Sequence, residues 1–158
     1  GADVPFFLEG GTSVGFERGD VLFPLADLPR SFVVLVLPPF GVGTKSAYAW
    51  WDKYAGQPSP RPVALATFPV PVAELCNDLE APVIREHPEI GQFVAALTRE
   101  GASYAAMSGS GSTVFGLFNT LPRAQAAARK LATGATRTLV TTTLTRPQFT
   151  RRSAPRSL

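Results

Sequence analysis

Short apolar segments separated by glycine and proline dominate the first part of the chain. Residues 5–25 consist of such segments, which favour β-hairpins and turns. Residues 32–37 form a continuous run of β-branched and aromatic side chains, typical of a buried central strand, and two prolines end it. The pattern therefore predicts a sheet with this run inside it.

A helix is predicted to begin at Thr44, whose side chain can cap it. Helical spacing places Ala47, Tyr48 and Trp51 on one side of this helix. Trp50 and Trp51 are adjacent and face different ways, which predicts that one of them lies in the core.

Residues 72–101 have helical spacing throughout, after a proline-rich and polar stretch at 56–71 that we expect to be an exposed loop. Pro88 suits a first helical turn, and Gly101 is a natural stop. Between them lies a stripe at spacing i, i+3, i+4 and i+7, formed by Ile90, Phe93, Val94 and Leu97.

The remaining third reads as strand, strand, helix and strand. The strands are predicted at 103–107, 112–118 and 136–144, with an alanine-rich helix at 121–134 that closes on Gly134. From residue 32 onward this order predicts a ferredoxin-like βαββαβ sandwich. It is an α+β fold with an antiparallel sheet and an enlarged first crossover.

Composition supports a globular domain, with 45% hydrophobic and 17% charged residues. The formal charge is +3, but four arginines and no acid lie in residues 146–158, so the rest of the chain is close to neutral. We expect this basic tail to be disordered, and we expect no nucleic-acid partner because the positive charge does not cover a folded face. No apolar run approaches the ~20 residues that cross a bilayer, so no membrane partner is expected either.

The chain has one cysteine and one histidine, which excludes an internal disulfide and a His/Cys metal cluster. A reducing, cytoplasmic setting fits this composition. We interpret Cys76 as a small, buried hydrophobic residue. His87, directly before Pro88, is interpreted as a helix cap or a surface group.

The strongest local motif is "MSGSGSTVFG", residues 107–116. Glycines at 109 and 111 leave backbone N–H groups open toward an anion, and serine hydroxyls flank them. A tight hairpin turn between two strands explains the same residues. The motif lacks the lysine of a P-loop, which excludes a nucleotide site of that kind.

Asp3 lies in the glycine-led turn "GADVP" before an apolar run. Its carboxylate can accept a hydroxyl proton from a substrate, or it can hydrogen-bond its own turn.

Thr44 and Tyr48 are four residues apart on one predicted helix. Their hydroxyl and ring can hold a planar base by hydrogen bonding and stacking, or they can be a capping threonine and a core tyrosine.

The polar stretch "NDLE", residues 77–80, predicts a helix start. Asn77 would cap the helix, and Glu80 would close a capping box with it.

The order of four segments along the chain is more specific than any one of them. They are "GADVPFF", "FGVGTKSAY", "NDLE" with "HPEI", and "GASYAAMSGSGSTVFGLF". Together they resemble the C-terminal part of the 4-diphosphocytidyl-2-C-methyl-D-erythritol kinases. These belong to the superfamily of galactokinase, homoserine kinase, mevalonate kinase and phosphomevalonate kinase (GHMP). The resemblance runs from Gly1 to about Phe118.

The resemblance implies transfer of phosphate from ATP, with Mg²⁺, to the 2-hydroxyl of a cytidine diphosphate methylerythritol, in the non-mevalonate route to isoprenoid precursors. It implies that Asp3 accepts or orients the hydroxyl proton and that Thr44 and Tyr48 lie on the cytidine side. No side chain is assigned as a metal ligand. The residues implied beside the phosphates are Ser108, Gly109, Ser110, Gly111 and Ser112.

In the family, a glycine- and serine-rich loop at a helix N-terminus and a lysine precede the catalytic aspartate, and this sequence has no counterpart of either. We therefore expect a C-terminal portion that is inactive alone and has the missing N-terminal half as its partner. The surface facing that half should be apolar or disordered. The expected parts are residues 1–30, a remnant of the N-terminal domain's hairpin; residues 31–145, the C-terminal domain; and residues 146–158, the tail.

Three other functions stay open. A ferredoxin-like sandwich can be a small-molecule binding or regulatory module, because fold does not set function. A GHMP kinase acting on another alcohol is the nearest rival, and an interaction protein carried by the basic tail is the third.

Overall fold

The computed structural model describes residues 4–16, 18–54 and 75–154. The chain divides into two units, which are residues 1–31 with 142–158, and residues 32–141. Each is described by itself. The predicted loop at 56–71 lies outside the described residues. No helix in the described ranges is long and apolar enough to cross a bilayer.

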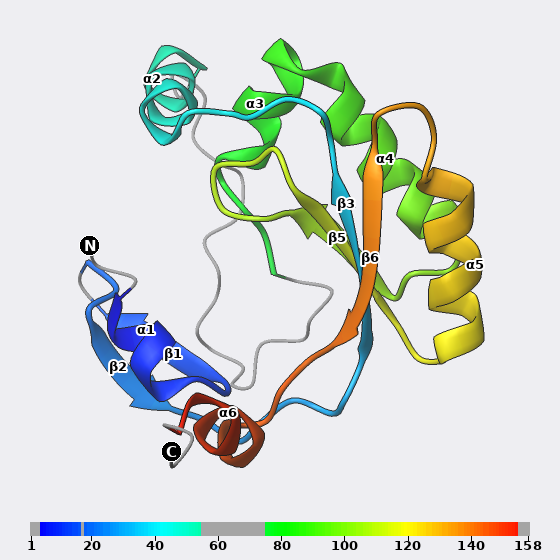
Figure 1. Ribbon diagram of the computed structural model, residues 1–158. Helices are drawn as coiled ribbons and strands as arrows, with labels where there is room; N and C mark the ends of the chain where they lie inside the picture. Colours follow the sequence, from blue (N-terminus) through cyan, green and yellow to red (C-terminus); the bar gives the residue numbers. More distant parts are fainter. Residues whose placement is uncertain (1–3, 17, 55–74, 155–158) are drawn as a thin grey trace. The chain divides into compact units, whose positions relative to one another are not determined.

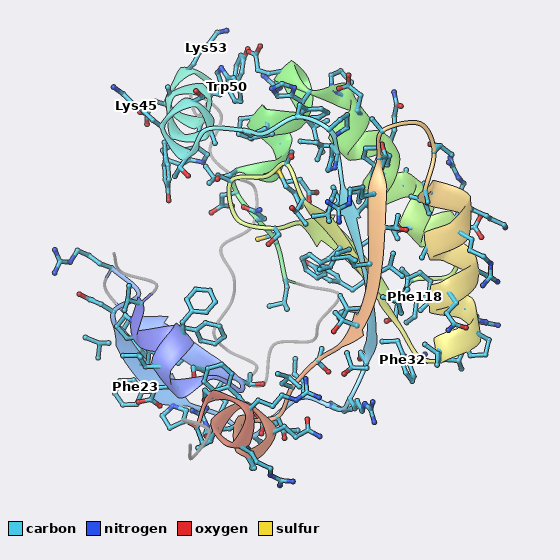
Figure 2. All side chains as sticks on the ribbon, viewed as in Figure 1. Phe23, Phe32, Lys45, Trp50, Lys53 and Phe118 are labelled. Carbon is cyan, nitrogen blue, oxygen red and sulfur yellow. The ribbon has the colours of Figure 1, made fainter. Side chains whose placement is uncertain are left out.

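The apolar run at 32–37 forms strand β3 (Phe32–Leu37), as predicted, inside a four-stranded sheet of order β4-β5-β3-β6. The other strands are β4 (Tyr104–Met107), β5 (Val114–Phe118) and β6 (Arg137–Thr142). Strand β5 pairs antiparallel with both β3 and β4. Phe32 and Phe118 are cross-strand partners in this register (Figure 2).

Two helices, α4 (Pro88–Arg99) and α5 (Leu121–Leu131), cover one face of the sheet (Figure 1). The first crossover also contains α2 (Thr44–Tyr54) and α3 (Glu80–Glu86), which pack on each other. This order is the predicted ferredoxin-like βαββαβ pattern with an enlarged first crossover. Its core consists of Val34, Val36, Ala47, Val83, Ile90, Leu97, Met107, Val114, Phe118, Ala124, Ala127, Ala128 and Leu131.

Helix α4 follows its sequence signals closely. Pro88 is in its first turn, Ile90 and Leu97 are fully buried, and Gly101 follows the helix with φ +91°. The helical spacing of 72–101 is interrupted twice, because residues 75–79 are not helical and His87 separates α3 from α4. A residue before proline avoids the helical region of backbone space, which explains the break at His87.

Trp50 is partly buried and packs against the core, whereas Trp51 is 40% exposed. The two side chains differ in burial, but neither tryptophan belongs to the buried core, so the prediction of one core tryptophan was wrong. Figure 2 shows Trp50 on the side of α2 toward α3, with Lys45 on the opposite side. Of the three residues predicted to share an inner side, only Ala47 is buried.

Residues 4–24 contain a helix where only hairpins and turns were predicted. Helix α1 (Val4–Glu9) precedes a two-stranded antiparallel hairpin of β1 (Ser13–Phe16) and β2 (Val21–Pro24). A run of five apolar residues, 4–8, does not distinguish helix from strand by periodicity. Pro5 in the first turn and Gly10, with φ +64° after the last, are the local helix signals.

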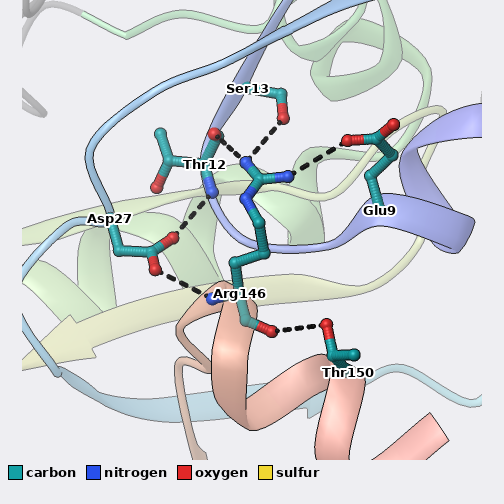
Figure 3. A network of polar contacts seen from close by, with 6 residues as sticks. All are labelled: Glu9, Thr12, Ser13, Asp27, Arg146 and Thr150. Carbon is teal, nitrogen blue, oxygen red and sulfur yellow. Dashed lines mark hydrogen bonds and ion pairs between the residues drawn. The ribbon is translucent and has the colours of Figure 1, made fainter. Parts of the chain in front are cut away.

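The prediction that the basic tail is disordered was also wrong, because residues 146–153 form helix α6 (Arg146–Ser153). Thr145 and Gln148 make a capping box at its start. The guanidinium of Arg146 contacts the Glu9 carboxylate at 3.2 Å and the Thr12 carbonyl at 2.8 Å (Figure 3). Asp27 accepts from the Arg146 backbone N–H at 2.8 Å. The helix is thus held by residues more than a hundred positions earlier.

The first unit exposes many large apolar side chains. Phe7 and Leu8 are 68% and 78% exposed. The other exposed members in this unit are Val4, Phe6, Phe16, Val21, Phe23 and Leu28.

Candidate active site

The glycine-rich segment connects β4 to β5 as a tight turn. The Gly111 N–H donates to the Ser108 carbonyl at 2.9 Å, and the Ser108 N–H donates to the Thr113 carbonyl at 2.8 Å. Gly109 and Gly111 have φ of +56° and +90°, which side chains with a Cβ rarely adopt. The turn therefore needs both glycines, and the hairpin interpretation of the motif holds for its backbone.

The same turn presents unused backbone donors. The N–H groups of Gly109, Ser110 and Ser112 have no acceptor among the residues that the structure describes. A Cβ built on Gly109 would meet nothing within 4 Å, so the space beside it is open. Backbone N–H groups without an acceptor next to open space can bind an anion.

Thr44 and Ser110, which are 66 residues apart in sequence, meet at this turn. Their hydroxyl oxygens lie 3.2 Å apart. Helix α2 begins at Thr44, as predicted, but the Thr44 hydroxyl contacts Ser110 and receives no capping hydrogen bond from the described residues of the helix. Tyr48, one turn further along α2, is 56% exposed, so it is not a core tyrosine. Its ring is accessible to a ligand, and no contact joins it to Thr44 in the described part of the chain.

Ser112 connects the turn to the segment that contains Phe40. Its buried hydroxyl donates a hydrogen bond to the Phe40 carbonyl. The Phe40 ring stacks on the His87 ring at 5.0 Å, and Trp50 lies 5.6 Å from the same imidazole. His87 occupies the backbone cap position of α4 without a side-chain cap, so its ring serves packing. The turn is thereby joined to the start of α4.

The "NDLE" residues do not form the predicted capping box. Asn77 donates to the carbonyls of Met107 (3.0 Å) and Gly109 (2.8 Å), and Glu80 accepts from the Met107 N–H at 2.6 Å. Leu79 is the cap residue of α3, with no side-chain cap. The local signal was read correctly as a helix start, but the two side chains bind a segment about 30 residues further on.

A polar cluster fixes the other end of α2. Tyr54 donates a hydrogen bond to Glu86, and Lys53 lies 2.8 Å from the Tyr54 hydroxyl and 3.5 Å from the Glu86 carboxylate. The Tyr54 hydrogen bond, and then the Lys53 ammonium, lower the pKa of Glu86. The Tyr54 hydroxyl is also the main cause that raises the pKa of Lys53.

Tyr104 lies at the start of the edge strand β4. Its hydroxyl donates to the Leu75 carbonyl at 3.1 Å. Burial, with a smaller contribution from the Glu80 carboxylate, raises the pKa of Tyr104. Cys76, between these residues in sequence, is exposed, which corrects its interpretation as a buried hydrophobe.

Asp3 lies outside the described residues. Within the described ranges, no group of three or more His, Cys, Asp or Glu side chains could hold a metal ion.

Comparison with known proteins points to one group of enzymes. Residues 67–135 match the family model of the C-terminal domain of the GHMP kinases. The 4-diphosphocytidyl-2-C-methyl-D-erythritol kinase of Moorella thermoacetica is 41% identical over 153 residues, which cover 91% of this chain and 54% of that protein. The same kinase of Solibacter usitatus is 40% identical over 127 residues, covering 75% of this chain and 40% of that protein.

Solved structures agree. A crystal structure of 4-(cytidine 5'-diphospho)-2C-methyl-D-erythritol kinase has a TM-score of 0.69 and 35% identity, covering 90% of this chain and 53% of that one. Homoserine kinase of Cytophaga hutchinsonii, at 19% identity and a TM-score of 0.53, shares the fold. The chain spans about half the length of the curated relatives it matches. Residues 67–135 therefore match the C-terminal domain of the GHMP kinases, and the chain as a whole is similar to about half of a 4-diphosphocytidyl-2-C-methyl-D-erythritol kinase.

Proposed function

We propose that this chain is part of an ATP-dependent kinase that phosphorylates the 2-hydroxyl of 4-diphosphocytidyl-2-C-methyl-D-erythritol. The observation that carries the proposal is the combination of 41% identity to such a kinase with a glycine-rich turn that has backbone donors without an acceptor among the described residues and open space beside Gly109. The non-mevalonate isoprenoid route is the corresponding pathway, and we propose a cytoplasmic location.

The turn at residues 108–112 is suited to hold phosphate oxygens. Phosphoryl transfer depends on placing the reacting groups and neutralising charge, and backbone N–H groups do both without adding a titratable side chain. Gly109, Ser110 and Ser112 would supply these donors. The Thr44 hydroxyl, 3.2 Å from that of Ser110, would bring the substrate side of the site next to the phosphate side.

Three side chains receive roles by resemblance. Asp3 would accept or orient the proton of the attacking 2-hydroxyl. Thr44 and the exposed Tyr48 would hold the cytidine, by a hydrogen bond and by ring stacking. ATP with Mg²⁺ would supply the phosphoryl group, and no described side chain is proposed as a magnesium ligand.

Turnover should need more than this chain, because the relatives are about twice as long as their match to it. A kinase also needs a loop that grips the nucleotide phosphates, and none is recognisable in this sequence. We propose that the other half of such an enzyme supplies it.

The test is an ADP-release assay on the complete protein that the gene encodes, with 4-diphosphocytidyl-2-C-methyl-D-erythritol as the acceptor and the present chain in parallel. We expect turnover by the complete protein and none by this chain. Asp3→Asn should lower kcat by roughly 10²- to 10⁴-fold, the usual contribution of a positioned proton acceptor. Asp52→Asn, an exposed carboxylate on α2, is the matched control.

Two results would contradict the proposal. Turnover of a different alcohol, such as homoserine, would make the protein another GHMP kinase. Binding of cytidine nucleotides without ADP release by the complete protein would favour a binding module.

A further inference from the structure

The edge strand β4 ends at Met107 with its outer backbone groups engaged by side chains. In an antiparallel strand the N–H and C=O of one residue point to the same side. Met107 pairs with Val114 in register, and its N–H and C=O are bound by Glu80 and Asn77 instead of by another strand. The two side chains thus take the place of a neighbouring strand at one residue only.

All three polar atoms or groups that the Asn77 side chain offers, two N–H donors and one carbonyl oxygen, form hydrogen bonds. Its amide has two N–H donors, and these bind the carbonyls of Met107 and Gly109 at 3.0 and 2.8 Å. Its carbonyl oxygen accepts from the Leu79 N–H at 3.1 Å, which fixes the orientation of the side chain. Both ends of the segment 107–109 are therefore tied to one amide group.

The carbonyl of Gly109 determines where the next N–H points. The peptide unit is planar and trans, so the Ser110 N–H points opposite to the Gly109 carbonyl. Because that carbonyl faces Asn77, the Ser110 N–H faces away from it. The Met107–Ser108 peptide, two units earlier, follows the same rule, since the Met107 carbonyl accepts from Asn77 and the Ser108 N–H donates to the Thr113 carbonyl. Unlike Ser108, Ser110 finds no acceptor among the described residues.

We propose that Asn77 and Glu80 are positioning residues of the phosphate site. Glu80 fixes the strand end through a charge-assisted hydrogen bond, and Asn77 sets the peptide plane that aims the Ser110 N–H at the ligand. This inference rests on the proposed kinase function, and it gives the "NDLE" stretch a role other than helix capping. The ligand is the phosphate group of the nucleotide or of the transition state.

The experiment uses the complete protein with Asn77→Ala, Glu80→Ala, Glu80→Gln and the control Asp78→Asn. Asp78 is adjacent, exposed and without a contact to the described residues. Steady-state kinetics with varied ATP separate kcat from KM, thermal melting reports stability, and hydrogen exchange reports the amides of 107–112.

We expect Asn77→Ala and Glu80→Ala to lower kcat/KM for ATP by about 10- to 100-fold, the scale of a small misplacement in an active site. Glu80→Gln should recover most of this loss, because an amide oxygen still accepts from Met107. Asp78→Asn should stay within about twofold of the wild type. Exchange of the hydrogen-bonded amides in this segment, those of Met107, Ser108 and Gly111, should accelerate in both alanine variants.

Kinetic constants unchanged in the folded alanine variants would overturn the inference, and so would a loss that vanishes once activity is corrected for the folded fraction. If the wild-type complete protein releases no ADP, the proposed function has failed by itself. Hydrogen exchange then decides the inference: unchanged exchange at 107–112 in Asn77→Ala would refute it, and accelerated exchange would support the loop-shaping role.

Discussion

Tyr54 donates a hydrogen bond to Glu86, and this contact joins the last residue of α2 to the last residue of α3. Helix α2 carries Thr44 and Tyr48, the two residues proposed to hold the cytidine. The contact therefore fixes one end of the helix whose other end lies at the glycine-rich turn.

Replacing Tyr54 by Phe should remove the hydrogen bond to the Glu86 carboxylate while keeping the aromatic ring. The Arg85 guanidinium lies 4.8 Å from the ring centre, and this contact survives the change. Because the Tyr54 hydrogen bond is the largest cause that lowers the pKa of Glu86, that pKa should rise toward its ordinary value. An NMR titration of the side-chain carboxyl measures it, with Tyr48→Phe as a control. An unchanged titration curve would show that Tyr54 does not stabilise the carboxylate.

The same carboxylate should make stability depend on pH. The pKa of Glu86 is lower in the folded chain than in the unfolded chain. Its contribution is therefore present above the ordinary glutamate pKa, about 4.3, and is lost as the pH falls through the lower folded value. The difference in stability between wild type and Glu86→Gln should be full at pH 7 and should close in acid. Urea unfolding at a series of pH values tests this, and a difference that stays constant from neutral pH to acid would refute it.

Arg146→Ala should destabilise the first unit by about 1–3 kcal/mol, because the guanidinium is the donor to the Thr12 carbonyl and the partner of Glu9. Arg151→Ala, an exposed change on the same helix, should stay within about 0.5 kcal/mol of wild type. Because the chain has two units, hydrogen exchange of amides in α1 and the β1–β2 hairpin is the suitable measurement. Equal effects of the two substitutions would mean that the Arg146 contacts do not stabilise the unit.

Ser112→Ala should lower the free energy of unfolding by about 1–3 kcal/mol, because the Phe40 carbonyl loses its donor in a partly buried place. Ser108→Ala is the matched control in the same turn, since the Ser108 side chain is exposed and its hydroxyl has no partner in the described ranges. Denaturant unfolding of both variants gives the comparison. A loss in Ser108→Ala as large as in Ser112→Ala would contradict the assigned role of the buried hydroxyl.

The parts of the fold that were predictable are those whose signals are local. Strand β3 and helix α4 were readable because their apolar patterns extend over six and twelve residues with clear ends. Helix α6 was missed because polar partners distant in sequence, Glu9 and Asp27, hold its first residue, and an arginine-rich segment alone resembles a solvated end.

The candidate site shows the same division. The glycine-rich turn was identified from its own residues, whereas its contact with Thr44 spans 66 positions and follows from the fold. "NDLE" has the local pattern of a capping box. In the fold, Asn77 and Glu80 instead hydrogen-bond to the backbone of Gly109 and Met107, at the end of β4 and in the turn that follows it. Spacing within a motif cannot reveal such a competition.

The pair Asn77 and Glu80 has a consequence for how this sheet meets other molecules. Strand β4 is an edge, and an edge normally offers free backbone groups to any strand that approaches. At Met107 both groups are already bound, so a strand from another chain finds neither donor nor acceptor there. The two side chains proposed to shape the turn therefore also block pairing with a further strand at Met107, the last residue of this edge strand.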